Sequence, residues 1–284
     1  MHEDAETAEA AGPAAGGAAA PAEGPKLELR PSRTFAPWLA GAGASLAFTT
    51  YQAGKIFLVG TNPETGRLSV HERSFTRCMG LGVGPDGALW MSSLYQLWRF
   101  ENFLERGTTH EGHDALYVPV EGRTTGDVDT HDVHPLGPGR APIFVVTRFN
   151  CLATLDHANS FAPVWLPPFV DRVAAEDRCH LNGLAMDGGR PAYVTCVAET
   201  NHAGAWRERR RDGGVVLDVA TGERVAGGLS MPHSPRLHGG ELYVVQSGTG
   251  EFGRVDRATG RFEPMCFLPG FARGMAFVDG CAVV

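Results

Sequence analysis

The sequence lacks the segments that direct a protein into or across a membrane. No apolar run approaches the roughly 18 residues that a membrane-spanning helix needs. The N-terminus carries acidic residues where a signal peptide carries basic ones, and it has no compact apolar segment. We therefore predict a cytoplasmic protein with no membrane partner.

Positive charge is also in short supply. The 25 Lys and Arg residues are outnumbered by 32 Asp and Glu residues, which leaves a formal net charge of −7. A nucleic-acid-binding protein presents a basic face to the phosphates. The acidic balance therefore argues against a nucleic-acid partner.

Familiar catalytic and metal-binding motifs are missing too. The six cysteines form no C-x-x-C pair, and several lie in apolar strand patterns, where a thiol behaves as a small buried hydrophobe. Structural disulfides are not expected in a reducing compartment. The sequence has no Gly-x-Ser-x-Gly elbow, no phosphate loop and no Rossmann fingerprint, so no standard motif indicates its function.

The beginning of the chain is poor in large apolar residues. Up to about residue 26 it consists mostly of Ala, Gly, Pro and Glu, which cannot form a core. An Ala-rich helix is the alternative, but Pro13, Pro21 and several glycines interrupt it. We predict a disordered tail over residues 1–34 and one folded domain over residues 35–284.

What the sequence does contain is a repeat. A polar residue, a short apolar run, a Gly-rich turn and a second apolar run recur along the chain, with few signs of amphipathic helices. The repeats come every ~35–50 residues with about four strands each, the period of propeller blades. We predict an all-β, six-bladed β-propeller, with a β-sandwich or another all-β array as the alternative. The six units start near Ser45, Met79, His131, Asn182, His233 and Arg273.

The chain ends at Val284, inside the expected second strand of the sixth unit. A blade needs about four strands, and an open ring would leave an unpaired sheet edge. We expect the last blade to be incomplete because the chain is truncated. The alternative is that the N-terminal segment completes it.

The first strand of each blade lines the central channel of a propeller, so equivalent positions on these strands should face one another. His131, Asn182 and His233 share one repeat position, each 51 residues from the next, and Arg273 follows them. Imidazole nitrogens and an amide oxygen are good ligands for Zn²⁺, Fe²⁺ or Mn²⁺. We predict one divalent metal ion bound by His131, Asn182 and His233, with Asp132 or Asp177 adding a carboxylate.

Catalytic roles are predicted for His131, His233 and Arg273. A bound metal would polarise a carbonyl. If no metal is bound, an imidazole can act as a general base. Three flanking residues are predicted to bind the ligand together with Asn182: Asp132, His134 and His180. Two alternatives stay open, a metal-free pocket for a small molecule and a channel that only holds ordered water.

A long polar loop follows the fourth unit's second strand. Trp206 and Arg207 in this loop are predicted to contact a ligand by stacking and charge, with a solvated basic loop as the alternative. The predicted function is a metal-assisted hydrolase or lyase acting on a small polar molecule. The alternative is a non-catalytic propeller that binds a ligand or a protein partner, because fold alone does not determine function.

Several stretches resemble an uncharacterised family of bacterial proteins with a domain of unknown function. They are residues 50–55, 175–185, 230–236 and 246–251, and the resemblance covers about residues 36–284. It implies a chain that continues past Val284, and it implies no activity.

More distantly, the run Asn182-Gly183-Leu184-Ala185 is similar to the Asn-Gly motif of the regucalcin, gluconolactonase and strictosidine-synthase-like six-bladed propellers. In the metal-dependent members this Asn is a metal ligand, so the resemblance implies that role for Asn182. Those lactonases also use acidic ligands, whereas the next blade here offers His233-Ser234 where an Asp is expected. The resemblance therefore does not imply calcium-dependent lactonase activity.

Overall fold

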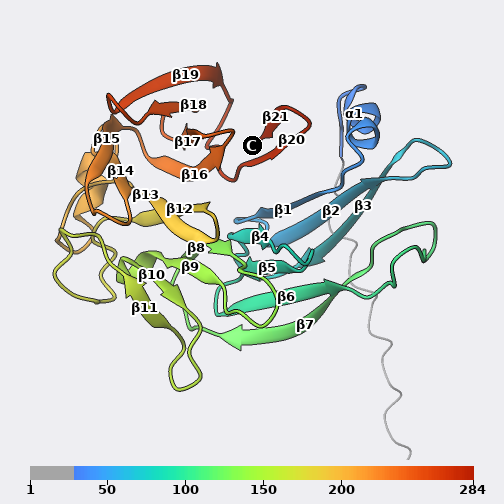
Figure 1. Cartoon of the computed structure of the whole chain (residues 1–284), viewed down its shortest axis with the longest axis horizontal. Helices are drawn as coiled ribbons and strands as arrows, with labels where there is room; N and C mark the ends of the chain where they lie inside the picture. Colours follow the sequence, from blue (N-terminus) through green and yellow to red (C-terminus); the bar gives the residue numbers. More distant parts are fainter. Residues whose placement is uncertain (1–28) are drawn as a thin grey trace, which may run out of the picture.

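The computed structural model describes residues 29–284, so most of the predicted tail lies outside the described residues. The strands form six antiparallel sheets around a central axis (Figure 1). The first sheet holds β1 (Leu46–Thr50), β2 (Lys55–Thr61) and β3 (Leu68–Ser74). The last holds only β20 (Ala276–Val278) and β21 (Cys281–Val283).

The four sheets between them have four strands each, paired in sequence order. The second sheet holds β4 (Leu81–Val83), β5 (Leu89–Ser92), β6 (Gln96–Asn102) and β7 (Tyr117–Thr124). The third holds β8 (Thr130–His134), β9 (Ile143–Val146), β10 (Cys151–Thr154) and β11 (Ala162–Trp165). The fourth holds β12 (Leu181–Asp187), β13 (Arg190–Cys196), β14 (Gly214–Asp218) and β15 (Arg224–Leu229). The fifth holds β16 (Pro232–His238), β17 (Glu241–Gln246), β18 (Glu251–Asp256) and β19 (Arg261–Phe267).

The fold is an all-β propeller, which confirms the prediction from the repeat. In each four-stranded sheet the first strand lies nearest the axis and the fourth lies at the rim (Figure 1). The inner strand β12 contacts both β8 and β16. Buried apolar clusters fill the space between neighbouring sheets, and Leu152 and Leu181 belong to one of them. The core is therefore a set of layers between blades, which leaves the axis free for polar side chains.

One short helix, α1 (Phe35–Gly41), precedes the first sheet. The sequence predicted no helix here. Pro37 is tolerated because it lies in the first turn, where backbone N–H groups have no partner within the helix. Leu39 is fully buried against Phe57 and Val59 of β2, so packing on the first sheet stabilises the helix.

The first sheet occupies a different part of a blade from the one predicted. The Asn62 side chain accepts hydrogen bonds from the N–H groups of Glu64 and Thr65 in the β2–β3 turn. Asp218 and Asp256 accept equivalent bonds in the turns between the third and fourth strands of later sheets. This match makes β2 and β3 the third and fourth strands of a blade, and β1 its second strand. The prediction that the inner strand of a blade begins near Ser45 is therefore wrong. The described residues place no strand on the inner side of β1.

Glycines let the inner strands approach closely around the axis. A Cβ atom added to Gly183 would lie 2.4 Å from Pro235 Cδ and 2.9 Å from Ser234 N on the next blade. Such contacts require the backbone to move, so this glycine has a packing role that the repeat pattern alone does not show.

Substituting this glycine should therefore destabilise the protein. We expect Gly183→Ala to lower the free energy of unfolding by about 1–3 kcal/mol, the usual cost of overpacking. Gly41→Ala is the control, because nothing lies within 4 Å of the added Cβ at the end of α1. Urea unfolding followed by circular dichroism measures both variants, and equal stability of Gly183→Ala and wild type would contradict the packing role.

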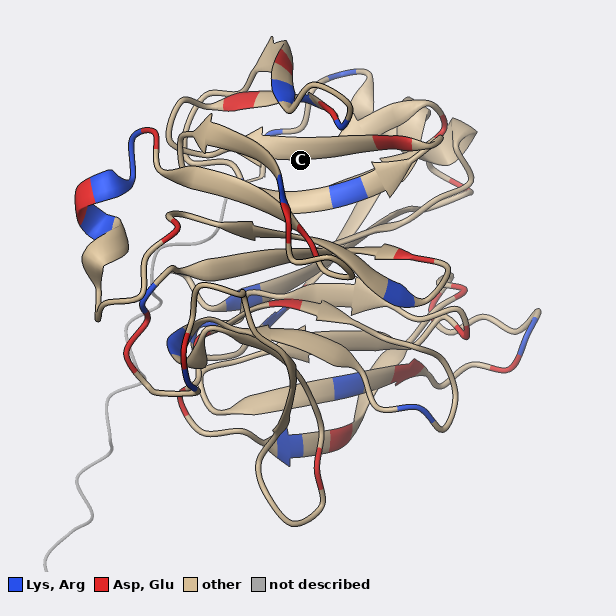
Figure 2. Ribbon diagram, turned by 60° about the vertical axis from the view of Figure 1, so that its left-hand side comes forward, with Lys and Arg blue, Asp and Glu red and all other residues tan. Residues whose placement is uncertain are grey.

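Charges of both signs are interspersed over the molecule rather than gathered on one face (Figure 2). Within residues 29–284, no helix has the length and apolar character needed to cross a membrane.

Candidate functional site

Equivalent backbone positions of successive blades converge on the axis. The hydroxyl groups of Ser92, Thr147 and Ser247 each donate a hydrogen bond to the carbonyl just before the next blade's axial residue. Those carbonyls belong to Thr130, Leu181 and Ala272, so the axial residues are His131, Asn182 and Arg273. At His131, Asn182 and Arg273, the repeat position inferred from sequence therefore coincides with a recurrent inter-blade hydrogen bond. The Thr49 hydroxyl donates to the carbonyl of Met79, so the equivalent residue of the second sheet is Gly80 and not Met79 as predicted.

Three imidazoles meet at this axis. One ring nitrogen from each of His131, His180 and His233 lies within 4.8 Å of the others. The His131 ring centroid is 4.9 Å from that of His180 and 6.3 Å from that of His233. The side chains are shielded from solvent, with 5% of His131, 10% of His180 and almost none of His233 exposed.

His131 and His233 have matching surroundings. His131 Nδ1 lies 3.0 Å from the Asp129 carbonyl and 2.7 Å from Thr147 Oγ1. His233 Nδ1 lies 2.8 Å from the Met231 carbonyl and 3.1 Å from Ser247 Oγ. A carbonyl can only accept, so Nδ1 carries the proton in both rings. In the neutral imidazoles the lone pair is then on Nε2, the atom that a metal would need.

His180 is oriented differently, by a carboxylate. Its Nδ1 lies 3.0 Å from Asp177 Oδ2, and the same oxygen accepts a hydrogen bond of 2.9 Å from Trp206 Nε1. The Trp206 ring lies over the imidazole with centroids 4.2 Å apart. Burial raises the pKa of Asp177, but the hydrogen bonds from His180 and Trp206 and the nearby positive charge together outweigh it and lower that pKa. A carboxylate behind a histidine is a common way to orient a metal ligand.

Two of the imidazoles are held in their neutral form. Burial, with a smaller contribution from the neighbouring His180, lowers the pKa of His131 to about 4. Burial also lowers the pKa of His233 well below its usual value, with Arg273 and His131 acting in the same direction. Both rings therefore offer a lone pair at neutral pH. The Nε2 atom of His233 is buried and has no hydrogen-bond partner among the described residues.

His180 completes the histidine cluster, and Asn182, predicted as the third metal ligand, has different partners. Its Oδ1 accepts a hydrogen bond of 2.7 Å from Thr195 Oγ1. Its Nδ2 is buried without a partner in the part of the chain that the structure describes. The unpartnered group of this amide is therefore a donor, and a metal-ligand role for Asn182 stays a prediction.

Asp132 and His134 lie on the same inner strand but take part in a different cluster. Arg236 donates two hydrogen bonds to the Asp132 carboxylate, at 2.9 and 3.2 Å, and the Leu184 N–H donates a third at 3.2 Å. His134 Nε2 lies 3.3 Å from Asp132 Oδ2. The expectation that Asp132 adds a metal ligand is therefore wrong, because its oxygens already brace β8, β12 and β16. Asp177 is likewise used as the hydrogen-bond partner of His180.

The remaining predicted residues lie around the same end of the channel. Trp206, in the short η2 helix (Ala205–Arg209), covers His180, and the Arg207 guanidinium lies 4.5 Å above the Trp206 ring. Arg273 Nη1 lies 3.3 Å from Met79 Sδ. The sequence analysis predicted that His180 contacts a bound molecule, but did not include it among the metal ligands. The signal for a metal-ligand role is Asp177, a carboxylate three residues before His180 that can orient its ring.

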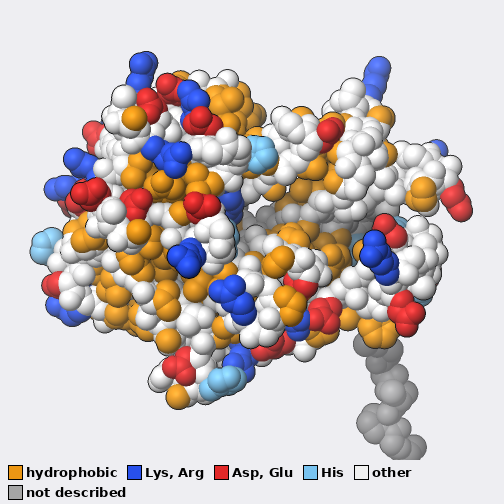
Figure 3. Space-filling view, in the orientation of Figure 1, with side chains coloured by type: hydrophobic (Ala, Val, Ile, Leu, Met, Phe, Trp, Pro, Cys, Tyr) orange, Lys and Arg blue, Asp and Glu red, His pale blue; other side chains and the backbone are white. Residues whose placement is uncertain are grey.

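Paired charges surround this end of the channel. Arg77 contacts Asp129 at 3.2 Å and Asp127 at 3.7 Å, and Arg148 contacts Asp127 at 2.8 Å. Arg77, Asp127 and Asp129 also line a small hollow there. In the space-filling view the molecule is hollowed between the C-terminal hairpin and the first sheet (Figure 3).

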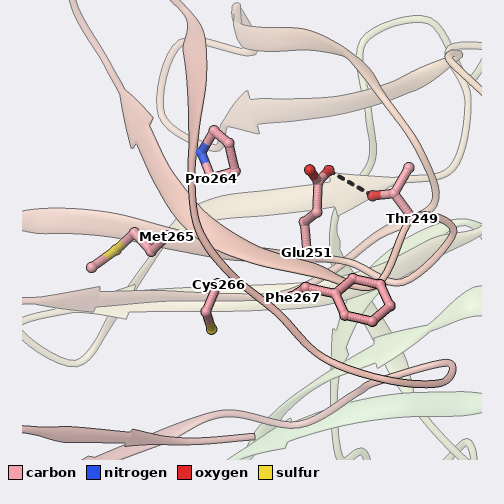
Figure 4. Close-up of a pocket in the computed structure, with 6 residues that line it drawn as sticks. All are labelled: Thr249, Glu251, Pro264, Met265, Cys266 and Phe267. Atoms are coloured by element: carbon pink, nitrogen blue, oxygen red, sulfur yellow. Dashed lines mark hydrogen bonds between the residues drawn. The ribbon is translucent and has the colours of Figure 1, made fainter.

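A separate hollow lies at the rim, between β18 and β19 (Figure 4). Met265 and Phe267 beside it are 61% and 70% exposed. Its one carboxylate, on Glu251, accepts a hydrogen bond of 2.8 Å from Thr249. It gathers no set of unpartnered polar groups, so the axial histidines are the better candidate site.

Residues 33–284 match the family model described as Domain of unknown function (DUF4915). The chain belongs to this family. No curated protein matches the DUF4915 chain.

Solved structures with a similar fold include a streptogramin B lyase, at 13% identity and a TM-score of 0.46, covering 84% of this chain and 72% of that one. Virginiamycin B lyase from Staphylococcus aureus is similar at 15% identity and a TM-score of 0.46, covering 83% and 71%. A dihydro-heme d1 dehydrogenase, NirN, matches at 15% identity and a TM-score of 0.39, covering 83% and 47%. These likenesses concern the fold alone. The link to regucalcin-like propellers stays a prediction.

Metal ligands depend on the groups behind them, which gives a test at Asp177. We expect Asp177→Asn to weaken metal binding by about 10–100-fold, because the group orienting His180 loses its charge. Asp212→Asn is the matched control, since Asp212 is exposed in the loop that also carries Trp206. Competition with a chromophoric chelator measures both affinities. Equal affinities for Asp177→Asn and wild type would show that Asp177 does not support a ligand.

Proposed function

We propose that this DUF4915 protein binds one divalent transition-metal ion through His131, His180 and His233. We further propose that it is a metal-assisted hydrolase or lyase acting on a small polar molecule. The observation that supports this is the convergence of three ring nitrogens within 4.8 Å, with each Nδ1 already engaged elsewhere.

Three histidines are enough to hold a metal ion, and the neutral rings of His131 and His233 have the lone pair that a metal needs. Three protein ligands leave a position open for water or substrate, as in catalytic zinc sites with three histidines. Ligand nitrogens in such a site lie roughly 3.3 Å apart, given Zn–N bonds of about 2.0–2.1 Å. A separation of up to 4.8 Å therefore requires the rings to close by on the order of an ångström.

A bound divalent ion would polarise a substrate carbonyl or lower the pKa of a bound water. The protein's own contribution is to orient the three imidazoles and to hold those of His131 and His233 neutral, since burial lowers the pKa of both. Hydrogen bonds from Nδ1 to Asp129 and Met231 carbonyls fix two rings, and the Asp177 carboxylate fixes the third. Trp206 covers His180 and shields it from water.

The alternative is a non-catalytic propeller that binds a ligand or a protein partner. The two proposals differ in what the metal does. We would load the protein with Co²⁺ and record its visible spectrum. We would then assay hydrolysis and elimination on small esters, lactones and amides before and after chelation. An enzyme should show turnover that chelation removes, that Zn²⁺ restores, and that His180→Ala lacks. A metal that binds without any turnover would favour the binding protein.

A further inference from the structure

Arg273 is the cation of the axial site that lacks an acidic partner. Arg77, Arg148 and Arg236 each contact a carboxylate within 4.0 Å. Among residues 29–284, no carboxylate lies within that distance of Arg273. Its guanidinium instead contacts the sulfur of Met79 at 3.3 Å, and a thioether is a weak acceptor. Arg273 is exposed and has no carboxylate partner within 4.0 Å among the described residues, so its guanidinium can bind an anion that enters from solution.

The backbone ties this arginine to the histidine cluster. Ser247 Oγ donates to the carbonyl of Ala272 and also contacts His233 Nδ1, so one hydroxyl joins the two segments. The Gly274 N–H donates to Ser234 Oγ at 2.9 Å. Phe271 lies against His233, with ring centroids 5.6 Å apart, and Arg273 Cζ lies 4.9 Å above the Phe271 ring. The guanidinium is therefore held beside the imidazoles.

A second donor lies at the axial position of the fourth sheet, with His233 between it and Arg273 in the series of axial residues. Asn182 Nδ2 is buried and unpartnered within the described part of the chain, while Asn182 Oδ1 is engaged by Thr195. A buried amide N–H without an acceptor costs free energy, which a ligand oxygen would recover. Together, a guanidinium and an amide donor beside a metal site select a ligand rich in acceptor oxygens.

We propose that the ligand of the axial site is a small organic carboxylate, held by Arg273 and Asn182 with its reacting group toward the three histidines. This inference rests on the proposed metal-dependent function. The planar fork of the guanidinium matches a carboxylate, and such paired hydrogen bonds are among the strongest in proteins. A phosphate group favours several cations or a cradle of backbone N–H groups, and Arg77 and Arg148 are already neutralised by Asp127 and Asp129.

Calorimetric titration of malonate into the full-length protein tests this inference. We would titrate malonate, its neutral diamide and inorganic phosphate into zinc-loaded and zinc-free wild type. The same titrations would be made with Arg273→Gln, Arg273→Lys and Arg148→Gln. Arg148→Gln is the matched control, because it removes one positive charge from the same end of the channel. Elemental analysis of each sample would record its zinc content.

We expect Arg273→Gln to weaken malonate binding by roughly 10–100-fold while its zinc content stays unchanged. The malonate affinity of Arg273→Lys should lie between those of wild type and Arg273→Gln, since lysine keeps the positive charge but lacks the planar guanidinium. Arg148→Gln should change the affinity by less than about twofold, because an exposed, paired charge contributes little. The diamide should bind more weakly than malonate to wild type.

Three results would overturn the inference: equal malonate affinity in Arg273→Gln and wild type, equal affinity for the diamide and malonate, or phosphate binding tighter than malonate. A wild type that binds no zinc would instead refute the proposed metal function. The zinc-free titrations would then still decide the role of Arg273. If zinc-free wild type binds malonate and Arg273→Gln does not, the proposed role of Arg273 is supported. If zinc-free wild type binds no malonate, that role is overturned.

Discussion

His180→Ala is expected to lose stoichiometric metal binding, whereas Asn182→Ala is expected to keep it. His180 contributes one of three converging nitrogens, while the amide oxygen of Asn182 is occupied by Thr195. Loss of one of three ligands should weaken Zn²⁺ binding by more than about 100-fold, beyond the effect of changing a supporting residue. Competition with a chromophoric chelator measures both variants.

The pair of variants separates two ligand sets with the same number of residues. The structure supports His131, His180 and His233, and the repeat position alone supports His131, Asn182 and His233. Metal loss in Asn182→Ala with retention in His180→Ala would contradict the structural set. Circular dichroism of both variants shows whether either change has altered the fold.

Asp132→Ala is expected to lower the free energy of unfolding by about 3–5 kcal/mol, the usual cost of leaving a buried ion pair with one partner. Asp132 is 5% exposed, and its carboxylate accepts two hydrogen bonds from Arg236 on β16. It also accepts the N–H of Leu184 on β12. The side chain therefore joins three blades at the axis. Urea unfolding measures the loss.

Two controls define this effect. Glu263→Ala removes an exposed partner of Arg254, and should cost less than about 1 kcal/mol. Asp132→Leu combined with Arg236→Met removes both charges and should recover most of the stability. Stability of Asp132→Ala within about 1 kcal/mol of wild type would show that the brace contributes no more than a surface pair.

The same carboxylate makes stability depend on pH. Burial raises the pKa of Asp132, but the charges and hydrogen bonds of Arg236 and His134 together outweigh it and hold that pKa below its usual range. A depressed carboxyl pKa stabilises the folded state above the unfolded pKa of about 3.9, and that stability is lost as the pH falls toward the folded pKa. Asp132→Ala should therefore lose less stability than wild type between about pH 4 and pH 2.

The propeller fold was predictable because repeated turns and apolar strands are encoded locally. The Gly-rich turns and the apolar runs recur every ~35–50 residues, which is visible without any tertiary contact. His131 and His233 were identified as axial residues for the same reason. The strand assignment near Ser45 failed because β1 has an apolar pattern that fits either the first or the second place in a blade. Only the Asn62 turn distinguishes the two.

The full histidine cluster was not predictable in the same way. His180 lies two residues before the axial position, where its backbone has a φ of 51°. Asp129 and Met231 have the same left-handed conformation at the equivalent positions, but their side chains are unlike an imidazole. Only folding brings the His180 ring to the axis. The ion pair of Asp132 and Arg236 also escaped sequence reasoning, since the partners are 104 residues apart.

The most direct test of the metal site is elemental analysis of the purified full-length protein beside a His131→Ala/His233→Ala double variant with an unchanged circular dichroism spectrum. The proposed metal site predicts one equivalent of a transition metal in the wild type after reconstitution, and none in the double variant. No bound metal in the wild type, even after incubation with Zn²⁺, Fe²⁺ or Mn²⁺, would contradict the metal site and favour a propeller that binds its ligand without a metal.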